Sequence, residues 1–260
     1  MSSLARSVAS ASLIALLVLS VSACAPQREP FPGETSATPT VPPVVETPTP
    51  TPTPTPTFDK TKNSIDDPAS LWVVANKLRP LNPKDYAAPD LVAVPVPYVY
   101  APSLRKKASD AVVAMFNAFN DETGLGMKSQ SAYRSYSAQV SVYNNWVSSL
   151  GQAGADLTSA RPGHSEHQTG LAIDISASDG KCALKACFAD TPQGSWLAEN
   201  AWKYGFILRY PNGETKTTGY EFEPWHYRYV GKALATEMHT TGITTMEEFF
   251  GLPDATDYAK

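Results

Sequence analysis

A strict Thr-Pro alternation over residues 47–57 rules out regular secondary structure in that part of the chain. Proline has no N–H to donate and fixes its own φ, so repeated proline excludes both helices and sheet ladders. The flanking residues are also rich in Pro, Thr, Val and Glu. We therefore expect residues 24–62 to form an extended, semi-rigid tether. At about 3.1 Å per residue it reaches on the order of 100 Å.

Residues 1–23 have the pattern of a signal peptide. One basic residue, Arg6, precedes an apolar run over residues 13–21 that is too short to span a membrane stably. The small residues directly before Cys24 resemble a bacterial lipobox. We predict that Cys24 is lipidated and anchors the chain to the cell membrane, outside the cytoplasm and facing the cell wall. The alternative is a plain signal peptide followed by an incidental cysteine.

The cysteine count agrees with lipidation. The chain has three cysteines, and an odd number is unusual in an exported protein. A lipid on Cys24 leaves Cys182 and Cys187, which an oxidising compartment favours as a disulfide. Closing this short loop stabilises the fold by about 2 kcal/mol in the chain-entropy model. Two free thiols in a surface loop are the alternative, and the absence of a nearby histidine argues against a zinc site at this pair.

Charge and length limit the remaining possibilities. The formal net charge is −4 and the sequence contains no basic run, so nucleic acid is not an expected partner. Residues 63–260 are long enough for one domain with a sizeable core, and we expect this domain to be a monomer.

Hydrophobic periodicity, caps and breakers predict the elements of this domain. Residues 71–74 and 91–94 are short apolar runs that predict an N-terminal wrap or edge strands. We expect helices at residues 103–123, 136–150, 195–204 and from residue 232, and strands at residues 127–133, 171–176, 206–210 and 226–230. Ser103 is expected to cap the first helix and Gly124 to end it, and Leu150 is expected to face inward from the second. Thr245 and Glu248 form a capping box near the end of the chain. Helices and strands do not alternate as βαβ units. The prediction is therefore α+β, with a small antiparallel sheet flanked by helices.

Residues 159–176 combine a Pro/Gly-containing loop with an alternating strand. One face of the strand is large and apolar, formed by Leu171, Ile173 and Ile175. Asp174 lies on the other face between small residues, and His167 precedes the strand. Of the other histidines, His164 is a loop residue and His239 belongs to a predicted surface helix, so neither is expected to bind a metal.

A metal site would use residues from two parts of the chain. Catalytic zinc takes three protein ligands from His and Asp/Glu and keeps one position open, and His167, Asp174 and His226 satisfy that count. Glu223 would then be a base beside the metal, because Pro224 turns the chain and allows Glu223 and His226 to converge. From spacing alone, structural histidines and a capping aspartate remain an equal alternative.

Four blocks of sequence resemble one known family. Residues 165–175 closely resemble the SEHQTGLAxDI signature of the VanY-type D-alanyl-D-alanine carboxypeptidases. Residues 223–231 are similar to the family's EPWHYRYVG block. Residues 131–139 are similar to its SxYRSYxxQ block, and residues 200–211 to its NAxxYGFxxRYP block. Order and spacing agree across residues 65–240, nearly all of the expected domain.

The resemblance implies a zinc-dependent enzyme that removes the terminal D-alanine from peptidoglycan stem peptides. Carried over by position, it implies His167, Asp174 and His226 as zinc ligands and Glu223 as the catalytic base. Glu223 would deprotonate a zinc-bound water, which attacks the carbonyl of the penultimate residue, and would then protonate the leaving amine.

The resemblance also implies roles around the reacting carbonyl. Arg134 is expected to polarise that carbonyl and stabilise the oxyanion. Ser165 and Gln139 are expected to hold the terminal carboxylate or the backbone of the substrate. Trp225 and Tyr227 flank the site and belong either to the cleft or to the core.

Three other functions remain open at this point. An L,D-carboxypeptidase acting on tetrapeptide stems shares all four blocks, and a dipeptidase releasing D-alanine from free D-Ala-D-Ala is a weaker option. The alternative from another class is a non-catalytic wall-binding lipoprotein. Glu223 argues against it, because a structural zinc site is closed by a fourth protein ligand and needs no base.

Overall fold

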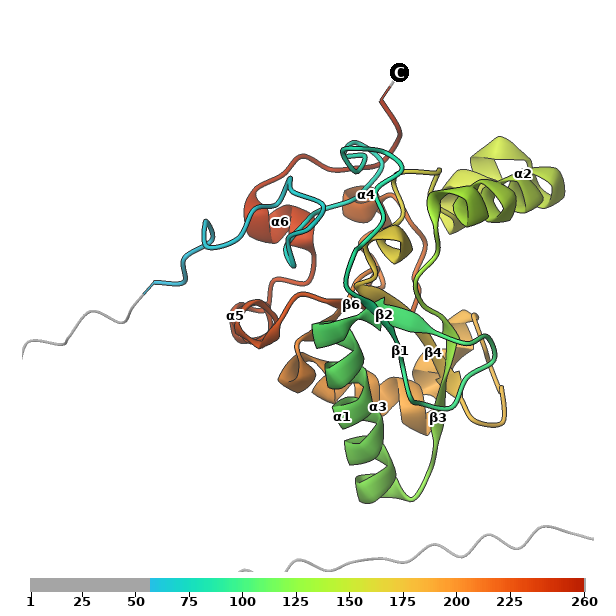
Figure 1. Ribbon diagram of the computed structural model, residues 1–260, viewed down its shortest axis with the longest axis vertical. Coiled ribbons are helices and arrows are strands. Elements are labelled where there is room, and N and C mark those ends of the chain that lie inside the picture. The colour runs from blue at the N-terminus through green and yellow to red at the C-terminus, as the bar shows by residue number, and fades with distance from the viewer. Residues whose placement is uncertain (1–56, 260) are drawn as a thin grey trace, which may run out of the picture. The chain divides into compact units, whose positions relative to one another are not determined.

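The computed structural model describes residues 57–259 (Figure 1). The predicted signal peptide, Cys24 and the tether up to residue 56 lie outside these residues. The last part of the predicted tether packs on the domain, since the Phe58 ring stacks on Trp72 with ring centroids 5.6 Å apart. Within the described range, no helix is both long enough and apolar enough to cross a membrane.

The described elements are short and mixed in type. The strands are β1 (Leu91–Ala93), β2 (Ser103–Arg105), β3 (Met127–Ser131), β4 (Ala172–Ala177), β5 (Phe206–Leu208) and β6 (His226–Tyr229). The α-helices are α1 (Lys106–Thr123), α2 (Tyr136–Thr158), α3 (Pro192–Asn200), α4 (Thr215–Thr218), α5 (Lys232–Thr241) and α6 (Met246–Phe250). Three 3-10 helices are η1 (Glu166–Thr169), η2 (Ala186–Asp190) and η3 (Ala201–Tyr204).

A four-stranded antiparallel sheet in the order β3-β4-β6-β5 forms the centre of the domain, and β1 and β2 pair separately. The predicted α+β class with a small antiparallel sheet is confirmed. In the register of β4 with β6, Asp174 lies directly opposite His226 and Ile173 lies opposite Tyr227. Because side chains alternate along a strand, Asp174 and His226 share one face of the sheet while Ile173 and Tyr227 share the other.

The apolar face of the sheet packs on α1 and α3, which Figure 1 shows beside the strands. Ile173 and Ile175 of β4 are fully buried together with Met115 of α1 and Leu197 of α3. Burying an aliphatic side chain of this size contributes about 1.5–3 kcal/mol. This core therefore sets which face of β4 is covered by helices, and it directs Asp174 to the opposite face.

A second apolar cluster joins the two ends of the described chain. Trp72 and Val74 pack with Leu234 of α5 and Phe249 of α6, next to Ile207 of β5. Residues 71–74 form no strand, so the prediction of a wrap holds for them, while residues 91–93 form the edge strand β1. The capping box before α6 is confirmed in part, because the hydroxyl of Thr245 accepts from the backbone N–H of Glu248.

The predicted start of the first helix is wrong. Ser103 lies in β2, and α1 begins after Arg105 without a side-chain cap. Residues 103–105 pair with β1, and these ladder bonds outweigh a single cap. The predicted end is confirmed, since Gly124 adopts a left-handed conformation with φ of 69°.

The second helix is longer than predicted. The structure extends α2 to Thr158, with a kink at Gly151, whose φ is 71°. Leu150 is 51% exposed, so its predicted inward position is wrong. The reason is visible in Figure 1, where α2 projects from the domain and packs against it over only part of its length. Trp146, on the same helix, is also 40% exposed.

Candidate functional site

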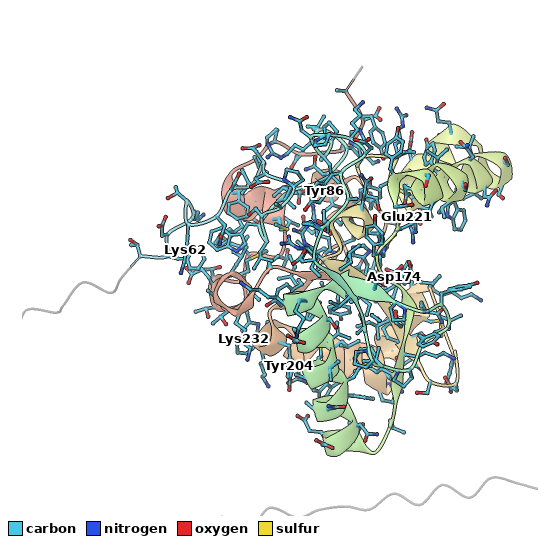
Figure 2. All side chains as sticks on the ribbon, viewed as in Figure 1. Lys62, Tyr86, Asp174, Tyr204, Glu221 and Lys232 are labelled. Carbon is cyan, nitrogen blue, oxygen red and sulfur yellow. A yellow bond between two sulfur atoms is a disulfide. The ribbon has the colours of Figure 1, made fainter. Side chains whose placement is uncertain are left out.

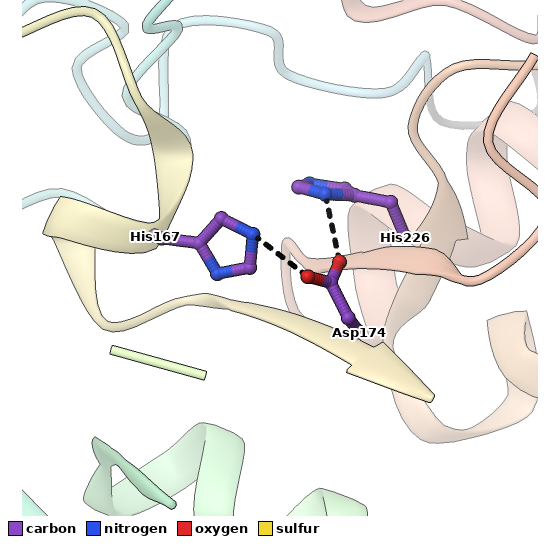
Figure 3. A group of neighbouring side chains, drawn as sticks. All are labelled: His167, Asp174 and His226. Atoms are coloured by element: carbon purple, nitrogen blue, oxygen red, sulfur yellow. Dashed lines mark ion pairs between the residues drawn. The ribbon is translucent and has the colours of Figure 1, made fainter. Parts of the chain in front are cut away.

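Three elements bring His167, Asp174 and His226 together (Figure 3). His167 belongs to η1, Asp174 to β4 and His226 to β6. Opposite residues of an antiparallel pair have their side chains close together, so the pairing of β4 with β6 places Asp174 beside His226. Gly170, with φ of 69°, ends η1 and turns the chain into β4, which brings His167 back over the strand.

The two imidazoles present one nitrogen each to Asp174. Nε2 of His167 lies 3.3 Å from Oδ2 of Asp174, and Nδ1 of His226 lies 3.2 Å from Oδ1 (Figure 3). The other nitrogen of each ring is engaged elsewhere. Nδ1 of His167 lies 2.7 Å from the carbonyl oxygen of Ala132, and Nε2 of His226 lies 3.4 Å from Oε2 of Glu166. Outer contacts of this kind fix the orientation of metal-binding histidines.

This donor set fits a zinc ion. One ligand atom from each of the three residues lies within 4.8 Å of the others, and all three residues are buried. Oδ1 of Asp174 is buried and accepts no hydrogen bond among the described residues. A buried acceptor without a partner is costly, and a cation bound between the three side chains would satisfy it. His167, Asp174 and His226 would hold zinc with an open position for substrate.

Metal and protons compete for His226. Burial alone would lower its pKa, but the carboxylates of Asp174 and Glu166 outweigh burial and raise the pKa to about 9 in the metal-free protein. The pKa of His167 is lowered, chiefly because the side chain is buried. Because metal binds the neutral imidazole, zinc held by this group would compete with a proton for His226.

A buried ion network lies behind His226. Oε1 of Glu166 accepts from Nε of Arg209 and from Nη1 of Arg228, both at 2.8 Å. Arg209 also makes a bidentate contact with Glu247 of α6, at 2.7 and 2.9 Å, and these four side chains are fully buried. Asn76 donates to Glu247 at 2.9 Å, which joins the N-terminal wrap to the same network.

Sequence reasoning missed this network. Its one available signal was the position of Glu166 directly before a predicted ligand. Burial alone would raise the pKa of Glu166, but Arg209 and Arg228 hold it far below its usual range. Glu166 is therefore ionised beside His226.

Glu223 lies in the turn before β6, as the position of Pro224 predicts. Its backbone N–H donates to the carbonyl of Tyr210 at 3.0 Å, and its own carbonyl accepts from the N–H of His226 at 3.1 Å. These bonds place Oε2 of Glu223 at 3.6 Å from Nδ1 of His226, on the side where the metal would lie. Burial raises the pKa of Glu223 to about 8 in the metal-free protein. The side chain is a carboxyl group next to the ligand set but outside it, and the positive charge of a bound metal would favour its ionised form.

Arg134 is held at the edge of the site by two acceptors. Nη1 donates to Oε1 of Gln139 at 2.8 Å, and Nη2 donates to the hydroxyl of Ser131 at 2.8 Å. A bulge in the pairing of β3 with β4 between residues 129 and 131 precedes this contact. Bulges re-aim side chains near functional sites, and here the chain turns Arg134 into the cleft.

The structure gives Gln139 a different place from the one expected. The side chain is fully buried and does not line the cleft. Its oxygen accepts from Arg134, and its nitrogen donates to the hydroxyl of Ser159 at 3.2 Å and to the carbonyl of Ala160 at 2.7 Å. All of its polar atoms are used by the protein, so Gln139 orients Arg134 instead of contacting the substrate.

A cleft of about 250 Å³ opens beside the donor set, at the small end of ligand-pocket volumes. The lining of the cleft includes the donor set and four of the other predicted site residues: His167, Asp174, His226, Glu223, Arg134, Ser165 and Trp225. No hydrogen bond among the described residues uses the hydroxyl of Ser165. Figure 2 shows Asp174 near the sheet and Glu221, another lining residue, toward α2.

Tyr227, His164 and His239 take structural places, and Trp225 does not. Tyr227 is 1% exposed and belongs to the main core, whereas Trp225 lines the cleft. Nδ1 of His164 lies 2.8 Å from the carbonyl of Asn76, away from the donor set. His239 is exposed and stacks on Trp202. Neither of these histidines belongs to the described metal group.

The predicted disulfide is confirmed. Cys182 and Cys187 are bonded, with their Cα atoms 5.5 Å apart. The loop that they close contributes Leu184 to the lining of the cleft, which sequence reasoning did not anticipate.

The fold and the site define a zinc peptidase, and comparison with known proteins gives the family. The family model described as VanY, D-alanyl-D-alanine carboxypeptidase, matches residues 101–232. A Bacillus subtilis (strain 168) protein, the putative carboxypeptidase YodJ, is 41% identical over 192 residues, which cover 72% of this chain and 69% of the relative. The chain belongs to the VanY family of D-alanyl-D-alanine carboxypeptidases.

Solved structures agree with this assignment. The LdcB LD-carboxypeptidase is similar with a TM-score of 0.66 and 41% identity, over 71% of this chain and 87% of that one. The vancomycin-resistance D,D-pentapeptidase VanY, solved in complex with Zn(II), gives a TM-score of 0.57 and 29% identity, over 69% and 98%. The protein is therefore a zinc-dependent carboxypeptidase of the D-alanyl-D-alanine type, and the non-catalytic alternative is wrong.

Proposed function

We propose that the chain removes the C-terminal D-alanine from peptidoglycan stem peptides by hydrolysis. The observation that carries this proposal is the buried carboxylate of Glu223, 3.6 Å from Nδ1 of His226 and outside the three-residue ligand group. A structural zinc site is closed by protein ligands, whereas a catalytic one keeps an open position and a base nearby.

The reaction adds water to the carbonyl of the penultimate residue and breaks its bond to the D-alanine nitrogen. Zinc, when held by His167, Asp174 and His226, lowers the pKa of water and polarises the carbonyl. Glu223 accepts a proton from the attacking water and later donates it to the leaving amine. The guanidinium of Arg134 faces the same cleft and stabilises the negative charge that develops on the carbonyl oxygen.

Ser165 is suited to holding the end of the substrate. It is 3% exposed, lines the cleft and directly precedes η1, which carries His167. A serine hydroxyl can donate to a carboxylate or a backbone carbonyl, and the small cleft, of about 250 Å³, fits short side chains such as those of alanine. We propose that Ser165 binds the terminal carboxylate or backbone of the stem peptide.

The test is Glu223→Gln in the full chain, assayed with zinc and a pentapeptide that ends in D-Ala-D-Ala. We expect kcat to fall by about 10²–10⁴-fold, because the base is lost while the three ligands remain. Zinc content measured by atomic absorption stays unchanged. Glu221→Gln is the matched control, because Glu221 is an exposed carboxylate lining the same cleft. Unchanged turnover in Glu223→Gln refutes the mechanism.

L,D-carboxypeptidase activity on tetrapeptide stems is the second candidate. The specific observation in its favour is the similarity to the LdcB LD-carboxypeptidase, at 41% identity and a TM-score of 0.66. The two activities differ in the configuration of the residue before the scissile bond. Release of D-alanine from a purified pentapeptide, with the matching tetrapeptide left intact, supports the D,D activity, and the reverse supports the L,D activity.

We also propose that the enzyme is a monomer, anchored by a lipid on Cys24 and extended into the cell wall by the Pro/Thr-rich tether. The sequence pattern around Cys24 and the Thr-Pro alternation support this placement. Expression of Cys24→Ala tests it, because loss of the lipid is expected to move the enzyme from the membrane fraction to the medium. Retention of Cys24→Ala in the membrane fraction contradicts the anchor.

A further inference from the structure

The disulfide loop between β4 and η2 has two features that the fold itself does not require. Cys182 and Leu184 have positive φ, at 56° and 53°, although neither is glycine. Such residues cost about 1–3 kcal/mol each and gather at functional sites. Leu184 is also 48% exposed, so its apolar side chain adds little to the core.

The position of Leu184 relates these features to the cleft. Leu184 lines the same cleft as Asp174 and His226, and so do Trp146 and Val142 of α2. Trp146 is 40% exposed. Trp146 belongs to α2, whereas Leu184 belongs to the loop between β4 and η2. Two exposed apolar side chains therefore enter one cleft from different elements.

Their depth indicates which part of a substrate they meet. The three ligand residues are 4–5% exposed, whereas Leu184 and Trp146 on the same cleft lining are 48% and 40% exposed and so lie closer to solvent. The bond that an exopeptidase cuts is close to the end of its substrate. With that end at the ligand group, the residues before the scissile bond extend outward past Leu184 and Trp146.

The disulfide explains how an exposed loop holds one side chain in place. Cys187 belongs to η2, and the next residue, Phe188, is fully buried in the main core. The bond from Cys182 to Cys187 thus ties the loop to an element anchored in the core. A covalent link of this kind removes alternative conformations that the loop would otherwise adopt.

On the basis of the proposed function, we propose that Leu184 and Trp146 form a rim subsite for aliphatic groups of the peptide that precede the scissile bond. The Cys182–Cys187 disulfide positions Leu184 for this contact. The subsite favours stem peptides over a bare dipeptide, because a dipeptide has only one residue before the scissile bond and leaves the rim empty. Its binding energy comes from apolar area buried between the peptide and the two side chains.

The test compares two substrates in the full-length protein: a stem pentapeptide ending in D-Ala-D-Ala and N-acetyl-D-Ala-D-Ala. We expect Leu184→Ala and Trp146→Ala each to raise the pentapeptide KM by about 10-fold, with kcat unchanged. A change of this size corresponds to the binding free energy from burying part of one apolar side chain. The KM for the acetylated dipeptide stays the same. Cys182→Ser/Cys187→Ser, and wild type treated with a phosphine reductant, are expected to change KM in the same way as Leu184→Ala.

Leu150→Ala is the matched control, because Leu150 is an exposed leucine that does not line the cleft. Equal effects on both substrates, or an unchanged pentapeptide KM in Leu184→Ala, overturn the subsite. Wild-type turnover of the pentapeptide tests the proposed function, independently of the subsite. If wild type does not cleave it, pentapeptide binding measured by calorimetry still decides the subsite, since Leu184→Ala must bind more weakly than Leu150→Ala.

Discussion

The carboxylate of Glu166 lies 3.4 Å from Nε2 of His226, across 60 residues of sequence. It faces the imidazole from the side opposite Asp174, whose Oδ1 lies 3.2 Å from Nδ1. Glu166 is itself held by Arg209 and Arg228, each at 2.8 Å. A carboxylate in this position fixes the ring and leaves Nδ1 available to a metal.

The first prediction concerns zinc affinity. The charge of Glu166 orients His226 and makes its imidazole more basic. Glu166→Gln removes that charge. We expect zinc affinity to fall about 10–100-fold. Competition with a chromophoric chelator measures this value directly, without reference to turnover.

Two further variants separate this effect from general instability. Glu248→Gln is the surface control, since Glu248 is exposed on α6 beside the buried Glu247. Glu166→Gln/Arg228→Gln removes one charge of each sign and leaves the pair of Arg209 with Glu247 in place. The double variant is expected to fold and still bind zinc weakly. Wild-type zinc affinity in it would show that Glu166 does not act on the metal site.

The second prediction concerns metal removal. Asp174 is buried with an acceptor that makes no hydrogen bond among the described residues, so the metal-free site is a weak point of the fold. Zinc binds only the folded chain tightly and stabilises it by about 2.7 kcal/mol at 100 times its Kd. Scanning calorimetry should show a higher Tm with zinc than after treatment with a chelator. Asp174→Asn is expected to lose most of this difference, and an equal zinc response in that variant would contradict the assigned ligand.

The third prediction concerns Arg134. Arg134→Ala is expected to lower kcat by about 10²–10³-fold, the effect of losing one group that stabilises the developing charge. Gln139→Leu should lower kcat less, because Arg134 keeps its bond to the hydroxyl of Ser131. Steady-state kinetics on the pentapeptide measure both variants. Gln152→Leu, at an exposed position of α2, is the control, and an equal loss in that variant would assign the effect to the helix as a whole.

The fourth prediction concerns pH and stability away from the metal. Asp156 accepts from the hydroxyl of Tyr143 at 2.6 Å and from Arg161 at 2.8 and 3.1 Å. Burial alone would raise the pKa of Asp156, but these contacts outweigh burial and lower it from 3.8. A lowered pKa means that the folded state favours the ionised form. The stabilisation is therefore complete above the unfolded pKa and disappears as pH falls through the folded value.

Asp156→Asn is thus expected to lower the free energy of unfolding by about 1–3 kcal/mol at pH 7. The difference from wild type should shrink below pH 3.8 and vanish at lower pH, where wild type is protonated as well. Urea unfolding at several pH values measures this difference. Asp110→Asn is the control, because the pair of Asp110 with Lys106 is 62% exposed on both sides. A difference that does not depend on pH would contradict the assignment.

The strongest predictions from sequence came from local rules. The two different faces of β4, the glycine that ends α1 and the turn at Pro224 each depend on neighbouring residues, and all three are found in the structure. The predictions that failed depended on packing. Ser103 pairs in a strand because residues 91–93 lie beside it, and Leu150 is exposed because α2 extends beyond the domain.

The donor types, their order and the resemblance to a zinc peptidase family are evident before any folding is considered, because they are properties of the residues and their spacing. The partners of those residues depend on the folded chain. The fold placed Gln139 behind Arg134, Glu166 against His226 and Leu184 at the cleft. Each of these contacts joins elements through the antiparallel register and the packing of the core. Long-range geometry of that kind is set by the whole fold and cannot be inferred from the spacing of residues along the chain.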